Sequence, residues 1–399
     1  MQAINLSDRI KALSPSKTLA MSQKSAELRA AGVDVINLSV GEPDFNTPDH
    51  IKEAAKKAID DNFSFYSPVP GYMSLRKAIA ENIRVTEGVA VAPEQIVVSN
   101  GAKQALCNVI LCAINPGDEV IIPTPAWVSY VEMVKLAEGV TVEVPASIEQ
   151  DFKITPQQLR DAITPRTRMV MLCSPSNPTG SVYSKSELQD LVDVLKDYPE
   201  ILVLSDEIYR HINFTGNYTS MATFPELAGR VVVINGVSKA YAMTGWRIGY
   251  SCAPVELAKA VTKLQSQYTS GPSSIAQKAA EAAYSGPQEC VEEMRQAFER
   301  RRNLVVKLAS EIPGLKVNNP QGAFYLFPEV SSFFGKRYGE RVINNASDLA
   351  LYLLEVGHVA TVDGEAFGLP GYIRLSYATS DDNIREAMKR IAAALAQLS

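Results

Sequence analysis

Histidine and cysteine are scarce in this sequence of 399 residues. None of the three histidines (His50, His211, His358) is at metal-ligand spacing from another, which leaves little material for a histidine-built metal site or a Ser-His-Asp triad. The cysteines are odd in number and form no CxxC pair, which argues against a disulfide framework or a zinc knuckle. We expect no bound metal, and buried, reduced thiols at Cys107, Cys112, Cys173, Cys252 and Cys290.

Long apolar runs and an excess of one charge are also missing. No apolar run reaches the roughly 18 residues of a membrane-spanning helix. The amino-terminal stretch "MQAINLSDRIKALSPSKTLAM" lacks the uninterrupted apolar core of a signal peptide. The net charge of −5 comes from interspersed acidic and basic residues, so no broad positive surface is offered to nucleic acid or to an anionic membrane. We therefore expect a cytoplasmic protein that binds neither.

Apolar sequence is abundant, at 46% of residues, and it comes in short runs. Between residues 49 and 287, β-branched runs alternate with amphipathic stretches such as "KSELQDLVDVLKD". The runs are "QIVVS", "DEVIIPTP", "RMVMLCSP", "ILVLSDE" and "RVVVINGVS". Near-continuous apolar strands separated by helices indicate a mostly parallel sheet covered on both faces. We therefore predict an α/β fold, with residues 49–287 forming a large domain.

The pattern changes after residue 287. A long amphipathic helix, "QECVEEMRQAFERRRNLVVKLASEI", precedes strands near "GAFYLFPEV" and "YIRLSYATS" and a terminal helix from about Asp381. Residues 1–48 are too few to fold alone. We expect them to pack on residues 288–399 and to complete a smaller, discontinuous α+β domain.

Two strand-to-loop junctions predict ligand contacts, because ligands of an open parallel sheet collect beyond the carboxyl ends of its strands. In "VVSNGAKQAL" a strand passes through Gly101 into a helix, which leaves the backbone N–H groups of Ala102 and Lys103 at an anion-binding helix terminus. In "CSPSNPTG" two prolines stiffen the loop around Asn177. Each junction by itself is more often ordinary turn chemistry.

Charged residues follow two further strands. "LVLSDEIYR" ends a strand in Asp206, with Tyr209 three residues later, although an aspartate there can also be a helix cap. Lys239 follows "RVVVING", beside Ser238 and eight residues before Arg247. A buried lysine without a partner loses its proton readily, and a desolvated amine is the nucleophile that imine formation needs. The alternative is a solvated surface lysine.

Together these residues meet the needs of one ligand, pyridoxal 5'-phosphate. This aldehyde-bearing pyridine with a phosphate arm needs an imine-forming lysine, a carboxylate at its ring nitrogen, donors at its phenolic oxygen, an aromatic partner and a phosphate cradle. The candidates, in that order, are Lys239; Asp206; Asn177 with Tyr209; Trp127; and Gly101 and Ala102 with Ser238 and Arg247.

The stretch from Gly236 to Gly249 resembles the pyridoxal-phosphate attachment signature of class I aminotransferases. The segments "GEPDF", "PAWVSY", "SPSNPTG", "SDEIY" and "AYAMTGWRIGY" recur in the family's order along nearly the whole chain, most closely as in bacterial aspartate aminotransferases of the prokaryotic subgroup. The resemblance implies the fold type I architecture of pyridoxal-phosphate-dependent transferases and a homodimer with two active sites at its interface. It also implies ping-pong transfer of the amino group of L-aspartate to 2-oxoglutarate, which gives oxaloacetate and L-glutamate.

The resemblance also assigns roles to individual residues. Lys239, Asp206 and Tyr209 fall at catalytic positions, and Tyr66 falls where a tyrosine of the partner subunit reaches the cofactor phosphate. Lys103 falls where this subgroup meets the side-chain carboxylate of aspartate, although spacing alone makes it a solvated residue at a helix start. Ser14 stands where some relatives have a basic residue, which leaves prephenate and other large dicarboxylic substrates open. Contacts with the amino-acid substrate are implied for Gly41, Trp127, Asn177 and Arg374.

Two other classes of function compete with transamination. A pyridoxal-phosphate-dependent β-elimination or decarboxylation would use the same cradle, but Arg374 argues against decarboxylation, because a bidentate clamp on the α-carboxylate holds that bond out of line for cleavage. A ligand-sensing domain of a transcription factor would need an added DNA-binding module, whereas here the expected fold begins almost at Met1. An aminotransferase with broader aromatic or prephenate specificity also stays open.

Overall fold

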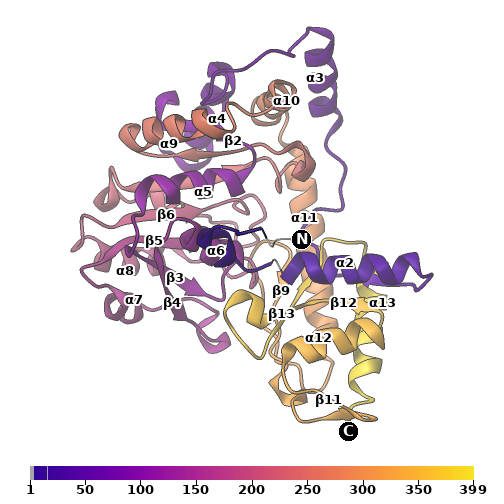
Figure 1. Cartoon of the computed structure of the whole chain (residues 1–399). Coiled ribbons are helices and arrows are strands. Elements are labelled where there is room, and N and C mark those ends of the chain that lie inside the picture. Colours follow the sequence, from indigo (N-terminus) through magenta and orange to yellow (C-terminus); the bar gives the residue numbers. More distant parts are fainter. Residues whose placement is uncertain (1–3, 16) are drawn as a thin grey trace.

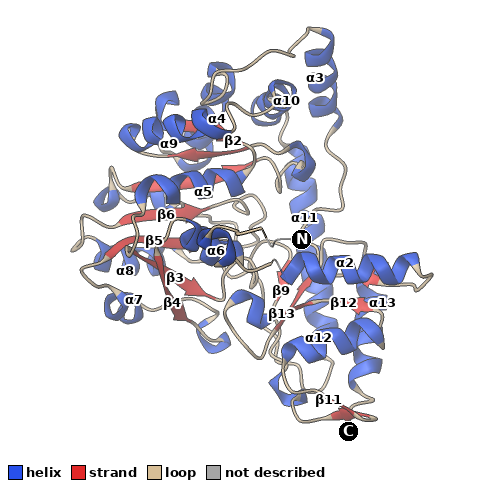
Figure 2. Cartoon of the chain, viewed as in Figure 1, coloured by secondary structure: helices blue, strands red, loops and turns tan. Residues whose placement is uncertain are grey.

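The computed structural model describes residues 4–15 and 17–399, and its larger part is built on a seven-stranded sheet (Figures 1 and 2). The strand order is β2-β8-β7-β6-β5-β3-β4, and all neighbours are parallel except those of β8, which runs antiparallel to β2 and β7. The strands are β2 (Ile96–Ser99), β3 (Glu119–Thr124), β4 (Val140–Pro145), β5 (Thr167–Cys173), β6 (Leu202–Asp206), β7 (Val231–Gly236) and β8 (Gly249–Cys252). The predicted α/β class and mostly parallel sheet are confirmed.

Helices cover both faces of this sheet, as the near-continuous apolar strands require. In β7, Val232 and Ile234 pack into the core shared with α5, α6 and α9, whereas Val233 points to the opposite face and packs with α3, α4 and α10. The helices of this part are α3 (Asp49–Asp60), α4 (Met73–Glu87), α5 (Ala102–Ala113), α6 (Ser129–Leu136), α7 (Pro156–Ala162), α8 (Lys185–Leu195), α9 (Val255–Tyr268) and α10 (Ser274–Ser285).

The long predicted helix after residue 287 is α11 (Glu289–Ser310), which runs from the large sheet layer into the smaller part (Figure 1). There, β9 (Tyr325–Leu326), β13 (Val362–Asp363) and β14 (Ile373–Ser376) form an antiparallel sheet in the order β13-β14-β9. The predicted strands near residues 325 and 373 and the terminal helix are confirmed. The other elements here are α12 (Ala346–Glu355), α13 (Asp381–Leu395), β10 (Arg337–Tyr338), β11 (Arg341–Val342) and β12 (Val359–Ala360).

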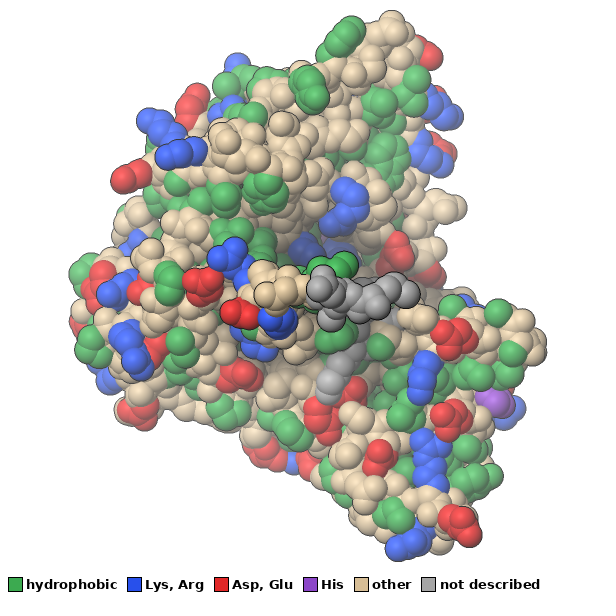
Figure 3. Space-filling view, in the orientation of Figure 1, with side chains coloured by type: hydrophobic (Ala, Val, Ile, Leu, Met, Phe, Trp, Pro, Cys, Tyr) green, Lys and Arg blue, Asp and Glu red, His purple; other side chains and the backbone are tan. Residues whose placement is uncertain are grey.

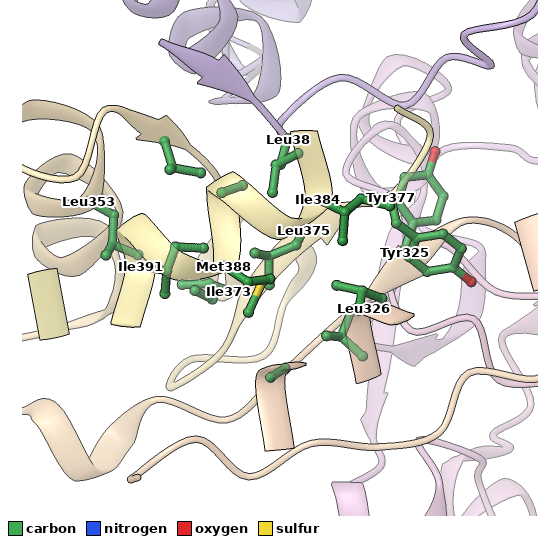
Figure 4. Close-up of a cluster of buried hydrophobic side chains, with 14 of the residues drawn as sticks. Leu38, Tyr325, Leu326, Leu353, Ile373, Leu375, Tyr377, Ile384, Met388 and Ile391 are labelled. Carbon is green, nitrogen blue, oxygen red and sulfur yellow. The ribbon is translucent and has the colours of Figure 1, made fainter. Parts of the chain in front are cut away.

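Amino-terminal residues join the core of this smaller part. Strand β1 (Ile36–Asn37) pairs in parallel with β12, and Leu38 lies among side chains of β14 and α13 (Figure 4). Tyr325 lies at the end of the same cluster that faces the larger part. The preceding helices are α1 (Asp8–Lys11) and α2 (Lys17–Ala30), and Met21 of α2 packs near α12. The domain boundaries at residues 48 and 287 stay a prediction.

Short 3-10 helices connect several elements: η1 (Pro93–Gln95), η2 (Ile148–Gln150), η3 (Met221–Thr223), η4 (Pro225–Leu227), η5 (Thr244–Trp246), η6 (Ser331–Phe333) and η7 (Gly364–Phe367). Within residues 4–15 and 17–399, no helix combines the length and apolar character needed to cross a bilayer.

The cysteines require one correction. All five are free thiols, but only Cys252 is buried. The other four are half-buried, because Cys107 and Cys112 lie on α5, Cys290 lies at the start of α11 and Cys173 ends β5 beside a cavity. The expectation of five buried thiols is therefore wrong for four of them.

Candidate active site

A cavity of about 370 Å³ lies beyond the carboxyl ends of β5, β6 and β7, and β9 and β14 of the smaller part close its far side. On the face shown in Figure 3, basic side chains gather around the hollow between the two parts of the molecule. Tyr66 is not among the residues that line the cavity, and Gly101 lies just outside it. The predicted site residues that do line it are Gly41, Ala102, Lys103, Trp127, Asn177, Asp206, Tyr209, Ser238, Lys239, Arg247 and Arg374.

Lys239 lies in the loop after β7, and its amine points into the cavity. Its Nζ donates a hydrogen bond to the Gly41 carbonyl (2.6 Å) and lies 5.8 Å from the centroid of the Tyr209 ring. Burial lowers the pKa of Lys239 to about 8; Glu42 opposes this change, and Arg374 adds to it. A solvated surface lysine is therefore excluded, and a large fraction of this amine is neutral near pH 8.

This desolvation has a measurable cost in the cofactor-free protein. We expect Lys239→Met to raise its free energy of unfolding at pH 7 by roughly 2 kcal/mol, since each pKa unit is worth about 1.4 kcal/mol and the lost hydrogen bond to Gly41 offsets part of the gain. The folded-state pKa is about 8 and the ordinary value is 10.5. Between these values only the unfolded chain still holds the proton, so wild-type stability rises with pH relative to the variant.

Urea unfolding between pH 6.5 and 10.5 measures this difference. The difference in the free energy of unfolding between Lys239→Met and the wild type should be constant below pH 8 and should vanish as the pH approaches 10.5. Lys259→Met is the matched control, because Lys259 is exposed on α9 and keeps its hydration in the folded protein. A gap that does not change with pH would show that Lys239 is not desolvated.

Asp206 is the last residue of β6 and is only 4% exposed. Its Oδ2 accepts a hydrogen bond from the Tyr130 hydroxyl (2.6 Å), and its Oδ1 accepts one from the Ile208 amide (3.2 Å). Burial raises the pKa of Asp206 to about 6, against the lowering effects of these two donors and of Lys239. Turns rather than a helix follow at residues 208–211, so Asp206 is not a helix cap. The carboxylate is mostly ionised at neutral pH and can hold a proton on a ring nitrogen.

Arg374 of β14 is buried (2% exposed) without a carboxylate partner among the ion pairs of residues 4–15 and 17–399. One Nη donates to Asn177 Oδ1 (2.9 Å) and the other to the Ser39 carbonyl (2.6 Å), while Nε has no hydrogen-bond partner in the described structure. Its guanidinium stacks between the rings of Tyr325 and Phe367, at 4.6 and 4.9 Å. A buried, unpaired cation is costly, so this site favours a ligand carboxylate.

Tyr209 and Tyr325 form a buried pair, with 2.8 Å between their hydroxyl oxygens. Burial raises the pKa values of both phenols, so both stay protonated at neutral pH. A side chain on Gly41 would collide with the Tyr325 hydroxyl, which explains glycine at this position. Tyr209 can therefore donate a hydrogen bond to a phenolic oxygen while it accepts one from Tyr325.

An anion cradle lies at the amino end of α5. Gly101 is the N-cap with φ +85°, and a Cβ there would collide with the Arg247 guanidinium, so glycine allows Arg247 to approach the helix terminus. Arg247 Nη2 donates to the Asn100 carbonyl (3.3 Å), and Ser238 is buried at the cavity wall. The first amides of a helix have no intrahelical acceptors and bind anions. This arrangement fits a phosphate.

Lys103 and Trp127 lie together at the cavity wall. Lys103 Nζ is 4.8 Å from the centroid of the Trp127 ring, and partial burial and Arg247 lower the pKa of Lys103. The Trp127 ring in turn meets the Tyr130 ring edge-on, with centroids 5.5 Å apart. Lys103 thus offers a second cation to a ligand that also reaches Arg374.

Sequence reasoning missed several cavity residues. Tyr130 is three residues after Trp127 and shares its side of the chain, which is a signal that "PAWVSY" contains. Tyr325 lies in the predicted strand "GAFYLFPEV", but nothing in that stretch indicates which of its aromatic residues faces the cavity. Thr244 and Cys173 also line the cavity and have no such signal.

The residues present fit pyridoxal phosphate. One cavity combines a desolvated amine, a buried carboxylate, an aromatic wall, hydroxyl and amide donors and a glycine-capped anion cradle, and it also holds an arginine whose Nε has no partner among the described residues. These groups match, one for one, the aldehyde, ring nitrogen, ring face, phenolic oxygen and phosphate of the cofactor and the carboxylate of an amino-acid substrate.

Comparisons with known proteins agree with this match. The family model "Aminotransferase class I and II" matches residues 33–391. The chain is 48% identical over 396 residues to an aspartate/prephenate aminotransferase of Nitrosomonas europaea (98% of this chain, 100% of that protein). It is 48% identical over 393 residues to an aspartate aminotransferase of Geobacillus stearothermophilus (97% and 98%). The aspartate aminotransferase structure from Rhizobium meliloti matches with a TM-score of 0.96 at 44% identity over 100% of both chains. The chain therefore belongs to the class I and II aminotransferases and is a pyridoxal-phosphate-dependent transaminase.

Proposed function

We propose that the chain is an aspartate aminotransferase, which transfers the amino group of L-aspartate to 2-oxoglutarate in a ping-pong reaction. The observation that carries this proposal is that, besides the Lys239 and Arg247 that would hold the cofactor, two further cations line the same cavity, the buried Arg374 and the more exposed Lys103. Aspartate, glutamate and their oxo acids each have two carboxylates. Relatives named aspartate aminotransferase and aspartate/prephenate aminotransferase support the same substrates.

The roles of the residues follow from their surroundings. Bound pyridoxal phosphate supplies an electron sink for negative charge at the substrate Cα. Lys239 would carry the cofactor. As a neutral amine it would then take the proton from the substrate Cα and deliver it to the cofactor carbon. Asp206 would keep a proton on the ring nitrogen, and Tyr209 and Asn177 would donate to the phenolic oxygen. Trp127 would stack on the ring.

Two sets of residues would hold the rest of the ligands. The phosphate would bind to the amides at Gly101 and Ala102, to Ser238 and to Arg247. The substrate α-carboxylate would displace Asn177 from part of the Arg374 fork, close to Gly41. A clamped α-carboxylate keeps its bond to Cα out of line for cleavage, which favours transamination over decarboxylation.

Selectivity between the two cations tests this assignment. We expect Arg374→Ala to lower kcat/KM for every amino acid, because all share the α-carboxylate. Lys103→Ala should lower kcat/KM for aspartate and glutamate by roughly 2 kcal/mol, about thirtyfold, and spare alanine and phenylalanine. Measurements with aspartate and phenylalanine in both variants decide the matter, and equal losses of both substrates in Lys103→Ala would refute the role of Lys103.

The range of substrates needs a separate experiment. Half-reaction spectra with aspartate, glutamate, alanine, phenylalanine and tyrosine, followed by prephenate as acceptor, separate strict from broad specificity. Prephenate is included because the family resemblance places Ser14, whose backbone amide donates to Glu132 on α6, where some aminotransferases have a basic residue. Release of ammonia from the amino donor without amination of the oxo acid would identify a lyase instead.

We also propose a cytoplasmic homodimer in which each subunit completes the other's site. Tyr66 is 97% exposed and the adjacent Phe65 is 79% exposed, on the loop before α4. Large aromatic side chains exposed side by side are typical of an interface. Tyr66 of one subunit would reach the cofactor phosphate of the other. Five free cysteines are typical of a reducing compartment.

A further inference from the structure

Tyr130 connects two parts of the cofactor site through one buried side chain. It lies in the first turn of α6, is 2% exposed, and donates its hydroxyl proton to Asp206 Oδ2 over 2.6 Å. Its ring edge meets the Trp127 ring at 89°.

Within the described residues, the hydrogen bond from Tyr130 is the shorter of the two that the Asp206 carboxylate accepts. The other comes from the Ile208 amide over 3.2 Å. A short bond to a carboxylate is charge-assisted and stabilises the ionised form over the neutral acid. Burial already raises the pKa of Asp206 to about 6, so loss of this donor would bring the titration of the carboxyl toward neutral pH.

Three titratable groups face Asp206 from the elements around it: Tyr130 on α6, Cys173 at the end of β5 and Lys239 after β7. Burial raises the pKa of the Cys173 thiol to about 12 and that of the Tyr130 phenol well above its ordinary value, so both stay protonated between pH 6 and 9. Lys239 is the one that titrates in this range. The experiment must therefore be designed so that the effect of Lys239 titration on ligand binding cancels.

We propose that Tyr130 is a positioning residue that keeps Asp206 ionised, so that the carboxylate is ready to hold a proton on the ring nitrogen of the cofactor. The proposal rests on the role proposed for Asp206. The Tyr130 hydroxyl donates to that carboxylate, whereas the Tyr130 ring packs edge-on against Trp127 and does not need the hydroxyl for this contact. A Phe side chain separates the two effects, because it keeps the ring and removes the hydroxyl.

The test compares two ligands of the cofactor-free protein: pyridoxal phosphate, and its carbocyclic analogue in which the ring nitrogen is replaced by CH. Both use Lys239 and the phosphate cradle, so the ratio of their dissociation constants isolates the ring nitrogen. Tyr130→Phe should weaken binding of pyridoxal phosphate at pH 6.5 by about tenfold or more, the scale of a lost charged hydrogen bond. Binding of the analogue should change by less than about twofold. At pH 9, Asp206 is ionised in both the wild type and Tyr130→Phe, so the two proteins should bind pyridoxal phosphate with nearly the same affinity.

Control variants separate failure of this proposal from failure of the role of Asp206. Tyr352→Phe removes an equally buried hydroxyl, which donates to the Ala394 carbonyl (2.7 Å) away from the cavity. This variant should leave the dissociation constants of both ligands unchanged. Asp206→Asn should weaken binding of pyridoxal phosphate and leave binding of the analogue unchanged. Adding Tyr130→Phe to Asp206→Asn should cause no further loss of binding. If Asp206→Asn does not discriminate between the ligands, the proposed role of Asp206 is wrong.

If Asp206→Asn discriminates between the ligands and Tyr130→Phe does not, Tyr130 has no such role. Equal weakening of both ligands by Tyr130→Phe would also overturn the proposal and reduce Tyr130 to a packing residue. Should Tyr130→Phe not fold, 3-fluorotyrosine at position 130 keeps the shape and donates more strongly. It should shift the pH dependence of the ratio toward lower pH, and an unchanged pH dependence would overturn the proposal.

Discussion

Lys239→Ala is expected to reduce transamination by about five orders of magnitude or more, since the reaction loses both its covalent anchor and the base at the substrate Cα. Of the two lysines that line the cavity in the described part of the chain, Lys239 is the more buried and has the pKa of about 8, whereas Lys103 is the more exposed. Single-turnover measurements with aspartate, monitored by cofactor absorbance, give the rate. Circular dichroism and thermal melting should show an intact fold.

A matched control and a chemical label make this prediction specific. Lys103→Ala removes the neighbouring lysine and should keep its rate with phenylalanine. Methylamine, which fits the space left by the lysine side chain, should restore part of the rate of Lys239→Ala. Borohydride fixes a carbonyl cofactor covalently to the lysine that carries it, and a peptide map with the label on another lysine would disprove the assignment.

Asp206→Asn is expected to lose on the order of a thousandfold in kcat/KM while Lys239 still takes up the cofactor. The neutral amide cannot hold the ring nitrogen protonated, so the cofactor becomes a weaker electron sink. The loss of a paired buried charge costs several kcal/mol, and about 1.4 kcal/mol is tenfold in rate. Steady-state rates with aspartate and 2-oxoglutarate measure the effect.

The neighbouring carboxylate provides the control. Glu207 is fully buried, accepts hydrogen bonds from Ser205 and Ser220, and lies outside the cavity. Glu207→Gln should change kcat/KM by less than about tenfold, even if it alters stability. Near-normal activity of Asp206→Asn, or an equal loss in both variants, would contradict the role of Asp206.

Parts of the fold could be predicted because each strand with two covered faces is apolar along most of its length. β2, β3, β5, β6 and β7 meet this condition, and all five were predicted. Along the edge strand β4, "VTVEVP", only Val144 is buried, so this strand lacks that signal. β8 was missed because "GYSC" contains no run of β-branched residues, and nothing in it indicates that the strand runs antiparallel to its neighbours.

The sequence by itself determined which residues stand at the carboxyl ends of the parallel strands, and therefore that Lys239, Asp206 and Asn177 meet. Only the tertiary structure decided the partners that tune them. Tyr130 is 76 residues from Asp206, Tyr325 is 116 from Tyr209, and Arg374 is 197 from Asn177. No local period or spacing connects such pairs, because their contacts depend on how helices and the smaller sheet pack against the large one. That packing also sets the burial that shifts each pKa.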